Sequence, residues 1–181
     1  MTVGTSVQHI YSVVSERERN IRTVIMQKGL LRGGSVAIAQ VQKEAARFMG
    51  ASDSFGVGVM RAVEFMPESV RAHADGSLGF AWKARQAALN SFKSTHGGAL
   101  ATLADAFTRI HLGASSPGLD ISSVSFEINY LNAIVENAEC TCVTRLLGGN
   151  GAGLHQMEYA FQDMEAQKVF ARGVHILSCG Q

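Results

Sequence analysis

The residues from 96 to 105 carry the strongest chemical signal in this chain. His96, Gly97 and Gly98 form a short turn that opens directly into an apolar run, which lacks the alternation of a strand and has the length of a helix. Glycines at a helix N-terminus present backbone N–H groups at the positive end of the helix dipole. Asp105 interrupts the apolar run, where a carboxylate is costly unless it is paired or used. Exposed donors and an embedded acid together can polarise a carbonyl and activate a water.

Asp105 also has a plainer interpretation. Thr102, Asp105 and Arg109 fall on one helical stripe, and Asp105 and Arg109 have the i,i+4 spacing of an ordinary surface ion pair. From the helix pattern alone, the two interpretations are evenly balanced. If Arg109 does reach Asp105, the guanidinium would favour the charged carboxylate, which suits a base.

The elements that must position these residues are one helix and a series of strands. Helical patterns occur over 8–26 and 35–48, and a central helix is expected over 97–112, ending at Gly113. Alternating apolar residues predict strands at 57–65, 70–74 and 78–84 before that helix and at 121–131, 138–147, 154–161 and 169–177 after it. One long helix within an otherwise antiparallel set of strands predicts an α+β fold, in which a sheet wraps around the helix.

Bulk composition argues against several classes of function. The chain has 181 residues, of which 46% are hydrophobic and 17% charged, as expected for one globular domain with an extension. The net charge of +1 gives no reason to expect a nucleic-acid partner, and charged residues interrupt every candidate membrane span. The three cysteines lack zinc spacing and are expected to be reduced, buried thiols, so neither a metal nor a cofactor is expected. The sequence predicts structural or surface roles for His111, His155 and His175.

Residues 1–50 are expected to form a helical extension before a domain at 51–181. Basic residues outnumber acids over 17–47, as in an organellar presequence, but Glu16 and Glu18 break the acid-poor pattern of such segments. The favoured interpretation is a solvated amphipathic helix appended to the domain. We therefore expect a cytoplasmic protein, with a mitochondrial location as the alternative.

The spacing around the glycine turn resembles the signature of hotdog-fold acyl-CoA thioesterases, most closely the phenylacetate-pathway and thioesterase superfamily member type. In that family an Asn precedes a His-Gly-Gly turn, and an Asp follows the His by nine residues. The matching positions are Asn90, His96, Gly97, Gly98 and Asp105, and a later Ser and Tyr match Ser123 and Tyr130. The chain departs from the pattern after Tyr130, where the family usually has a proline and this sequence has Leu131-Asn132-Ala133. The resemblance begins near residue 57.

The resemblance implies a reaction and a role for each matching residue. The reaction is hydrolysis of an acyl-CoA to a carboxylic acid and CoA. Gly97 is expected to hold the thioester carbonyl through its N–H, Asp105 to act as base or nucleophile, and Ser123 to help place water. Substrate-binding and orienting roles fall to Asn90, His96 and Gly98. The sequence does not decide between activation of water and direct attack by Asp105.

The placement of Gly97 and Asp105 on one helix implies a site made by two chains. Residues eight apart on a helix are separated by about 12 Å along its axis, whereas reacting atoms must approach within roughly 3.5 Å. Two antiparallel helices that face each other across a two-fold axis would bring each Gly97 to the partner's Asp105. We therefore expect a homodimer or a dimer of dimers.

Two other hotdog functions remain open. A hydratase or dehydratase would need a paired His and acid at its own spacing, and no such pair is evident. A non-catalytic acyl-thioester binding protein would share the fold and lose nothing when Asp105 is removed. The glycine-rich segment 148–153 resembles a phosphate-binding loop, but neither a helix nor a Lys follows it, so a turn between strands is expected. A Ser-His-Asp esterase is not expected because the Gly-x-Ser-x-Gly elbow is absent.

Overall fold

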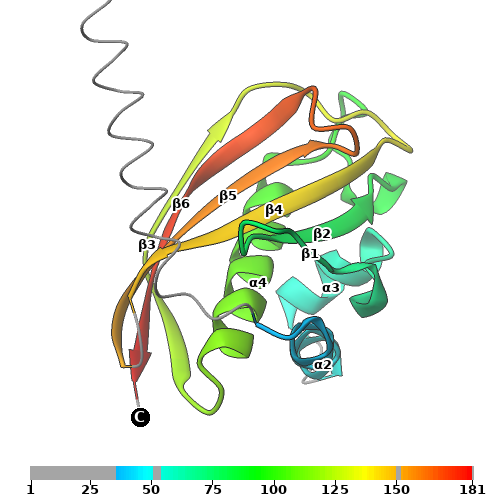
Figure 1. Ribbon diagram of the computed structural model, residues 1–181. Helices are drawn as coiled ribbons and strands as arrows, with labels where there is room; N and C mark the ends of the chain where they lie inside the picture. The colour runs from blue at the N-terminus through cyan, green and yellow to red at the C-terminus, as the bar shows by residue number, and fades with distance from the viewer. Residues whose placement is uncertain (1–35, 51–53, 150–151, 181) are drawn as a thin grey trace, which may run out of the picture. The chain divides into compact units, whose positions relative to one another are not determined.

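The computed structural model describes residues 36–50, 54–149 and 152–180 (Figure 1). A six-stranded sheet with antiparallel pairing lies against the long helix α4, and two shorter helices, α2 and α3, pack against the same helix. The strand order across the sheet is β1-β2-β4-β5-β6-β3. The predicted α+β fold, with one central helix against an antiparallel sheet, is therefore confirmed.

The elements have the following bounds in chain order. The first are α2 (Ile38–Gly50), α3 (Phe55–Ala62), the 3-10 helix η1 (Pro67–Ser69), β1 (Arg71–Ala72), β2 (Leu78–Lys83) and the 3-10 helix η2 (Gln86–Ala88). They are followed by α4 (Gly97–Ser115), β3 (Asp120–Tyr130), β4 (Glu139–Gly148), β5 (Gly153–Asp163) and β6 (Val169–Gly180). The four strands after α4 lie within a few residues of their predicted ranges. The helix expected over 8–26 lies outside the described residues.

The core forms where α4 meets the sheet. Phe107 of α4 stacks on Phe80 of β2 with ring centroids 4.7 Å apart. The ring of Phe65 also packs against Phe107, with centroids 5.1 Å apart. Leu103 and Ile110 on the same helix are fully buried. Burying such side chains is the main favourable contribution to folding, so this apolar contact fixes α4 against the sheet.

The prediction of a strand over 57–65 is wrong, because residues 57–62 belong to the helix α3. Its buried residues are Val57 and Met60, followed by Val63, and a spacing of three suits a helix rather than a strand. The side chain of Ser54 caps the helix by accepting a hydrogen bond from the N–H of Val57. The apparent alternation was misleading because it placed half-buried Val59 on the same face as Val63.

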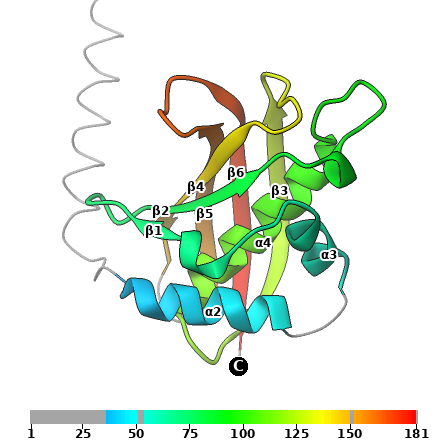
Figure 2. The same ribbon diagram turned by 90° about the vertical axis from the view of Figure 1, so that its right-hand side faces the viewer.

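The central helix does not end at Gly113 but continues to Ser115. A side chain at position 113 would place its Cβ 2.8 Å from a carboxylate oxygen of Glu44, which belongs to α2. Gly113 therefore lies inside the helix and beside the Glu44 side chain of α2, and it does not terminate α4. Figure 2 shows α2 crossing in front of the lower part of α4.

The helix α2 belongs to the same compact unit as the sheet, which runs from Val36 to Gln181. Val41 and Ala45 are fully buried in the main core, and the side chain of Gln40 donates a hydrogen bond to the carbonyl of Ala114 at 2.8 Å. This unit begins at Val36, whereas the boundary was expected at residue 50. The apolar face of α2 packs against α4, so α2 is part of the unit that contains the sheet. None of the helices in the described part of the chain has the length and apolar character needed to cross a membrane.

The strand β3 carries an irregularity that the sequence did not predict. Its pairing with β6 shifts between Ser123 and Ser125, so Val124 is an extra residue that bulges from the ladder. Side chains on one face of a strand recur every second residue, and the bulge changes this phase. As a result Ser123 before it and Phe126 after it both lie on the side of the sheet that faces α4.

Candidate active site

The turn that opens α4 leaves the N–H of Gly97 without an acceptor among the described residues. His96 is the N-cap residue, and its Nδ1 accepts a hydrogen bond from the N–H of Gly98 at 2.9 Å. The N–H of Gly97 donates to no described residue. Of the two glycine donors that the sequence suggested, Gly98 is thus occupied by the cap, while Gly97 is available at the positive end of the helix.

Tyr130 fixes this turn from the end of β3. Its hydroxyl donates a hydrogen bond to the carbonyl of Gly97 at 2.9 Å. A Cβ at position 97 would lie 3.2 Å from the Tyr130 ring, so the close packing favours glycine there. The family position that matched Tyr130 therefore holds the Gly97 backbone in place.

Asn90 shapes the loop that leads into the turn. Its side-chain oxygen accepts hydrogen bonds from the N–H groups of Phe92 and Ser94, at 2.9 and 3.2 Å, and from the Ser94 hydroxyl at 3.2 Å. The N–H of His96 donates to the carbonyl of Ala88 at 2.8 Å, which anchors the end of the same loop. Asn90 and His96 therefore build the backbone that presents Gly97.

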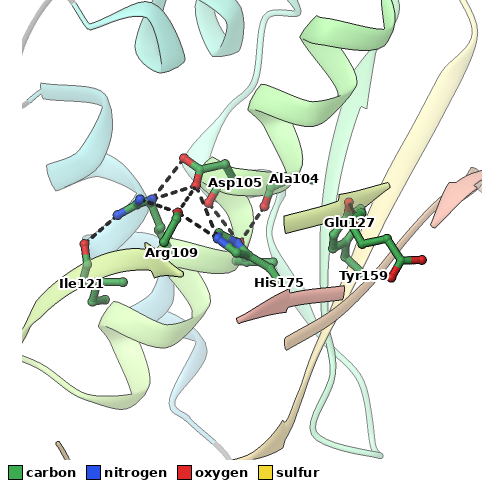
Figure 3. A network of polar contacts seen from close by, with 9 residues as sticks. Ala104, Asp105, Arg109, Ile121, Glu127, Tyr159 and His175 are labelled. Carbon is green, nitrogen blue, oxygen red and sulfur yellow. Dashed lines mark hydrogen bonds and ion pairs between the residues drawn. The ribbon is translucent and has the colours of Figure 1, made fainter. Parts of the chain in front are cut away.

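Asp105 lies two turns further along α4, beside Arg109. The Nε of Arg109 donates to both carboxylate oxygens, at 2.9 and 3.0 Å (Figure 3). The other guanidinium nitrogens donate to the carbonyl of Ile121 at 2.6 Å and to the hydroxyl of Ser123 at 2.7 Å. The ion pair expected from i,i+4 spacing does form, but it is tied to β3 and fixes the direction of the carboxylate.

Ser123 joins Asp105 to a residue that the sequence analysis did not assign to the site. Its hydroxyl oxygen lies 3.0 Å from Oδ1 of Asp105 and 2.9 Å from Nε2 of His175. The hydroxyl has one proton, so it can donate to only one of these two atoms at a time. The bulge in β3 provides this contact, because it sets the phase of the strand at Ser123.

His175 is fully buried on β6, so of the structural or surface roles expected for it, the surface role is wrong. Its Nδ1 lies 2.8 Å from the hydroxyl of Thr108, and its ring meets that of Phe126 edge-on at 5.1 Å. Burial lowers the pKa of His175 to about 4; Asp105 opposes that shift and Arg109 adds to it. The imidazole is therefore neutral near pH 7. The alternation of β6 could have indicated burial, but no local pattern connects position 175 with Asp105.

The carboxylate of Asp105 opens onto an apolar pocket of about 360 Å³. Its side chain is 40% exposed, whereas that of His175 behind it is not exposed at all. The pocket lies between α3, α4 and β3, and its walls are Phe55, Gly56, Ala101, Thr102, Asp105 and Phe126. One wall, formed by Phe55 and Gly56, comes from the first turn of α3, just before the segment that was predicted to be a strand. A charged, oriented carboxylate at the edge of an apolar pocket suits proton transfer next to a bound apolar group.

Within one chain the structure brings together only part of the predicted site. Asp105 and Ser123 are in direct contact, while Asn90, His96, Gly97 and Gly98 lie at the N-terminal end of α4. Gly97 and Asp105 belong to the same continuous helix, which keeps them about 12 Å apart along its axis. The donor and the acid of one chain therefore cannot act on the same carbonyl carbon.

Comparison with solved structures identifies the fold. The chain is similar to zebrafish thioesterase superfamily member 2, with a TM-score of 0.65 and 24% identity over 80% of this chain and 99% of that one. It is similar to the Escherichia coli PaaI protein from the phenylacetic acid degradation operon, with a TM-score of 0.62 and 16% identity over 80% of this chain and 97% of that one. These likenesses show that the chain has the hotdog fold.

A third similar structure contains a ligand. It is a hypothetical thioesterase protein with coenzyme A from Streptococcus pneumoniae, with a TM-score of 0.54 and 21% identity over 61% of this chain and 86% of that one. No protein-family model matches the sequence, and no curated protein matches it.

Proposed function

We propose that this protein is an acyl-CoA thioesterase that hydrolyses the thioester to a free carboxylic acid and CoA. The observation that carries the proposal is the carboxylate of Asp105, which Arg109 orients and which opens onto an apolar pocket. Two of the three solved structures described above are named as thioesterases, and one of these two holds coenzyme A. An apolar pocket suits the acyl group, and no cofactor is needed for hydrolysis.

In the proposed reaction, the N–H of Gly97 donates to the thioester oxygen and stabilises the negative charge that develops there. Asp105 takes a proton from a water whose oxygen attacks the carbonyl carbon. The carbon–sulfur bond then breaks, and the CoA thiolate leaves and is protonated. The alternative, in which Asp105 itself attacks the carbon, uses the same carboxylate and differs in whether an acyl-enzyme forms.

The proposed site is shared by two chains, because one helix cannot present both groups to one carbon. The strand β3 supports this arrangement, since among the described residues it lies at the edge of the sheet and pairs only with β6. It is eleven residues long and mostly exposed, and a long, exposed edge strand is a ready surface for pairing with another chain. Pairing of two β3 strands across a two-fold axis would extend the sheet and bring two α4 helices together. We propose a homodimer, or a dimer of dimers.

The function is tested by removing the charge of Asp105. Asp105→Asn keeps the shape of the side chain but removes the base, so release of free thiol from a panel of aliphatic and aromatic acyl-CoAs should fall by about a hundredfold or more. Glu165→Gln, which neutralises an exposed acid in the turn between β5 and β6, serves as the control and should retain wild-type turnover. Binding of acyl-CoA without turnover by the wild type would favour an acyl-thioester binding protein, and consumption of enoyl-CoA a hydratase.

The shared site is tested by complementation between two inactive chains. Gly97→Pro removes the N–H but suits the first position of a helix, and His96 already has the extended backbone that a following proline requires. Co-expressed with Asp105→Asn, it should restore about a quarter of wild-type activity, since half the dimers are mixed and each has one intact site.

Two results would contradict the shared site. One is a mixture that stays as inactive as its components, and the other is a fully active monomer by sedimentation. Gly97→Ala is the control for crowding against Tyr130, because it adds the Cβ and keeps the N–H.

A further inference from the structure

The pocket beside Asp105 is lined mainly by apolar groups. Its lining residues are Phe55 and Gly56 of α3, Ala101, Thr102 and Asp105 of α4, and Phe126 of β3. Among these described residues, only Thr102 and Asp105 have polar side chains. The hydroxyl of Thr102 donates a hydrogen bond to the carbonyl of Gly98 at 2.8 Å, so it is held by its own helix. Beyond the carboxylate of Asp105, the pocket therefore suits an uncharged hydrocarbon chain.

One side of the pocket is fixed by packing. The ring of Phe126 stacks on that of Tyr159 with centroids 5.5 Å apart, and it meets the ring of His175 edge-on at 5.1 Å. Both neighbours are buried, so Phe126 is held on two sides and does not turn away from the pocket. A bound chain must fit the space between Phe126 and α3, which packs beside α4 (Figure 2).

The opposite side of the pocket lacks a side chain at Gly56, in the first turn of α3. A Cβ at this position would lie 3.9 Å from a carbon of the Phe48 ring and 3.9 Å from the methyl group of Thr102, which are ordinary contact distances. The backbone of Gly56 is not left-handed, so neither crowding nor its φ angle requires glycine there. Glycine is a poor helix former, and here the missing side chain leaves open the space beside the Thr102 methyl.

Gly58 provides a contrast within the same helix. A Cβ there would have no described atom within 4 Å, and the residue is exposed. Gly58 is not among the residues that line the pocket. A side chain at position 58 would therefore point into solvent, whereas one at position 56 would point toward the Thr102 methyl in the pocket wall.

The pocket extends along α4 from Asp105 toward the N-terminal end of the helix. Its other lining residues on α4 are Ala101 and Thr102, and Thr102 precedes Asp105 by about 4.5 Å along the helix axis. A carbonyl carbon attacked next to Asp105 lies at one end of this space. An acyl chain must then extend by several carbons before it reaches Thr102 and Gly56.

We propose that Gly56 is a specificity-determining residue, which admits the distal carbons of an aliphatic acyl chain between α3 and Phe126. This inference rests on the proposed thioester hydrolysis, because that reaction places the carbonyl carbon beside Asp105. A side chain at position 56 fills the space that the end of the chain occupies, so it shortens the acyl group that the pocket accepts.

The chain-length profile of Gly56 variants tests the proposal. Gly56→Leu should lower kcat/KM for lauroyl-CoA by at least about tenfold more than for butyryl-CoA, since a single methylene in an apolar pocket is worth roughly tenfold. Gly56→Ala, whose Cβ fits at ordinary contact distance, should shift the ratio less and in the same direction. Comparing two substrates within one variant cancels any loss of folded protein. Gly58→Leu is the matched control and should keep the wild-type ratio.

Two kinetic results would overturn the role of Gly56. One is a wild-type ratio in both Gly56 variants, which would show that the chain does not pass position 56. The other is an equal shift of the ratio in Gly58→Leu, which would show that any bulky residue on α3 has the same effect.

Binding distinguishes this inference from the proposed function. In Asp105→Asn protein, isothermal titration with lauroyl-CoA and with CoA alone measures what the acyl chain adds without turnover. Lauroyl-CoA should bind more tightly than CoA, and addition of Gly56→Leu should weaken lauroyl-CoA binding by about tenfold or more, whereas Gly58→Leu should not. If the wild type hydrolyses no acyl-CoA but this binding depends on Gly56, the proposed function fails and the acyl site stands. Hydrolysis by the wild type together with lauroyl-CoA binding that is indifferent to Gly56→Leu overturns the acyl site alone.

Discussion

Two buried histidines of this protein have nearly the same surroundings and different relations to the candidate site. His111 on α4 places its Nδ1 2.8 Å from the hydroxyl of Thr144 on β4, and His175 on β6 places its Nδ1 2.8 Å from Thr108 on α4. Burial is the largest cause of a lowered pKa in both, and it brings each to about 4. In both cases a threonine on the facing element holds a neutral imidazole inside the fold.

The difference lies at the second ring nitrogen. Nε2 of His175 meets Ser123, and through it Asp105 and Arg109, whereas the hydrogen bonds of the His111 ring in the described part of the chain end at Thr144. Burial and a threonine are therefore enough to fix the charge state of a histidine. Whether the histidine contacts the candidate site depends on which element lies beside its other ring nitrogen.

The largest expected effect is shared by both histidines and concerns stability in acid. Each folded-state pKa, about 4, lies below the ordinary 6.5, so between these values the unfolded chain binds more protons. Stability should therefore fall as the pH falls from 6.5 toward 4, by roughly 3 kcal/mol for each histidine. His111→Leu and His175→Leu should each flatten this dependence, measured by urea unfolding at fixed protein concentration and compared with the same variant at pH 7. If only one of the two variants showed a weaker pH dependence of stability, the two histidine environments would not be equivalent.

The next effect should separate the two histidines. His175→Leu removes the ring nitrogen that contacts the Ser123 hydroxyl beside Asp105, and it should lower kcat for thioester hydrolysis about tenfold, equivalent to about 1.4 kcal/mol. His111→Leu removes an imidazole of similar burial from outside the site and should change kcat by less than about twofold. Steady-state thiol release at pH 7.5, with folding checked by circular dichroism, compares them. Equal losses in both variants would show that only packing is being measured.

The smallest effect concerns the threonine of the pair outside the site. Thr144→Val leaves Nδ1 of His111 without its partner and should cost about 1 kcal/mol of stability at pH 7, the scale of one buried hydrogen bond. The hydrogen bonds of the His111 ring in the described residues end at Thr144, away from Asp105, so kcat should stay at the wild-type value. A fall in kcat like that expected for His175→Leu would contradict the separation between the two pairs.

Much of this architecture could be predicted because the relevant signals are local. The run after the glycine turn was predicted to be a helix because it is apolar without alternation, and the later strands because their apolar residues alternate. The motif around Asp105 was recognisable by its resemblance to a family signature, and the pairing of Asp105 with Arg109 could be predicted from their i,i+4 spacing on one helix. The segment 57–65 failed because its short apolar pattern is compatible with both periods, and only its contact with α4 selects the helix.

The sequence by itself therefore determined the helix, the four strands that follow it, the acid and its arginine, because each depends on neighbours within a few residues. Only the tertiary structure decided that Ser123 and His175 stand behind Asp105. Ser123 reaches it through a bulge that changes the phase of β3, and His175 through the position of β6 next to β3. These contacts join residues 18 to 67 positions apart along the chain. Sheet register and helix packing bring them together, and no local periodicity records either.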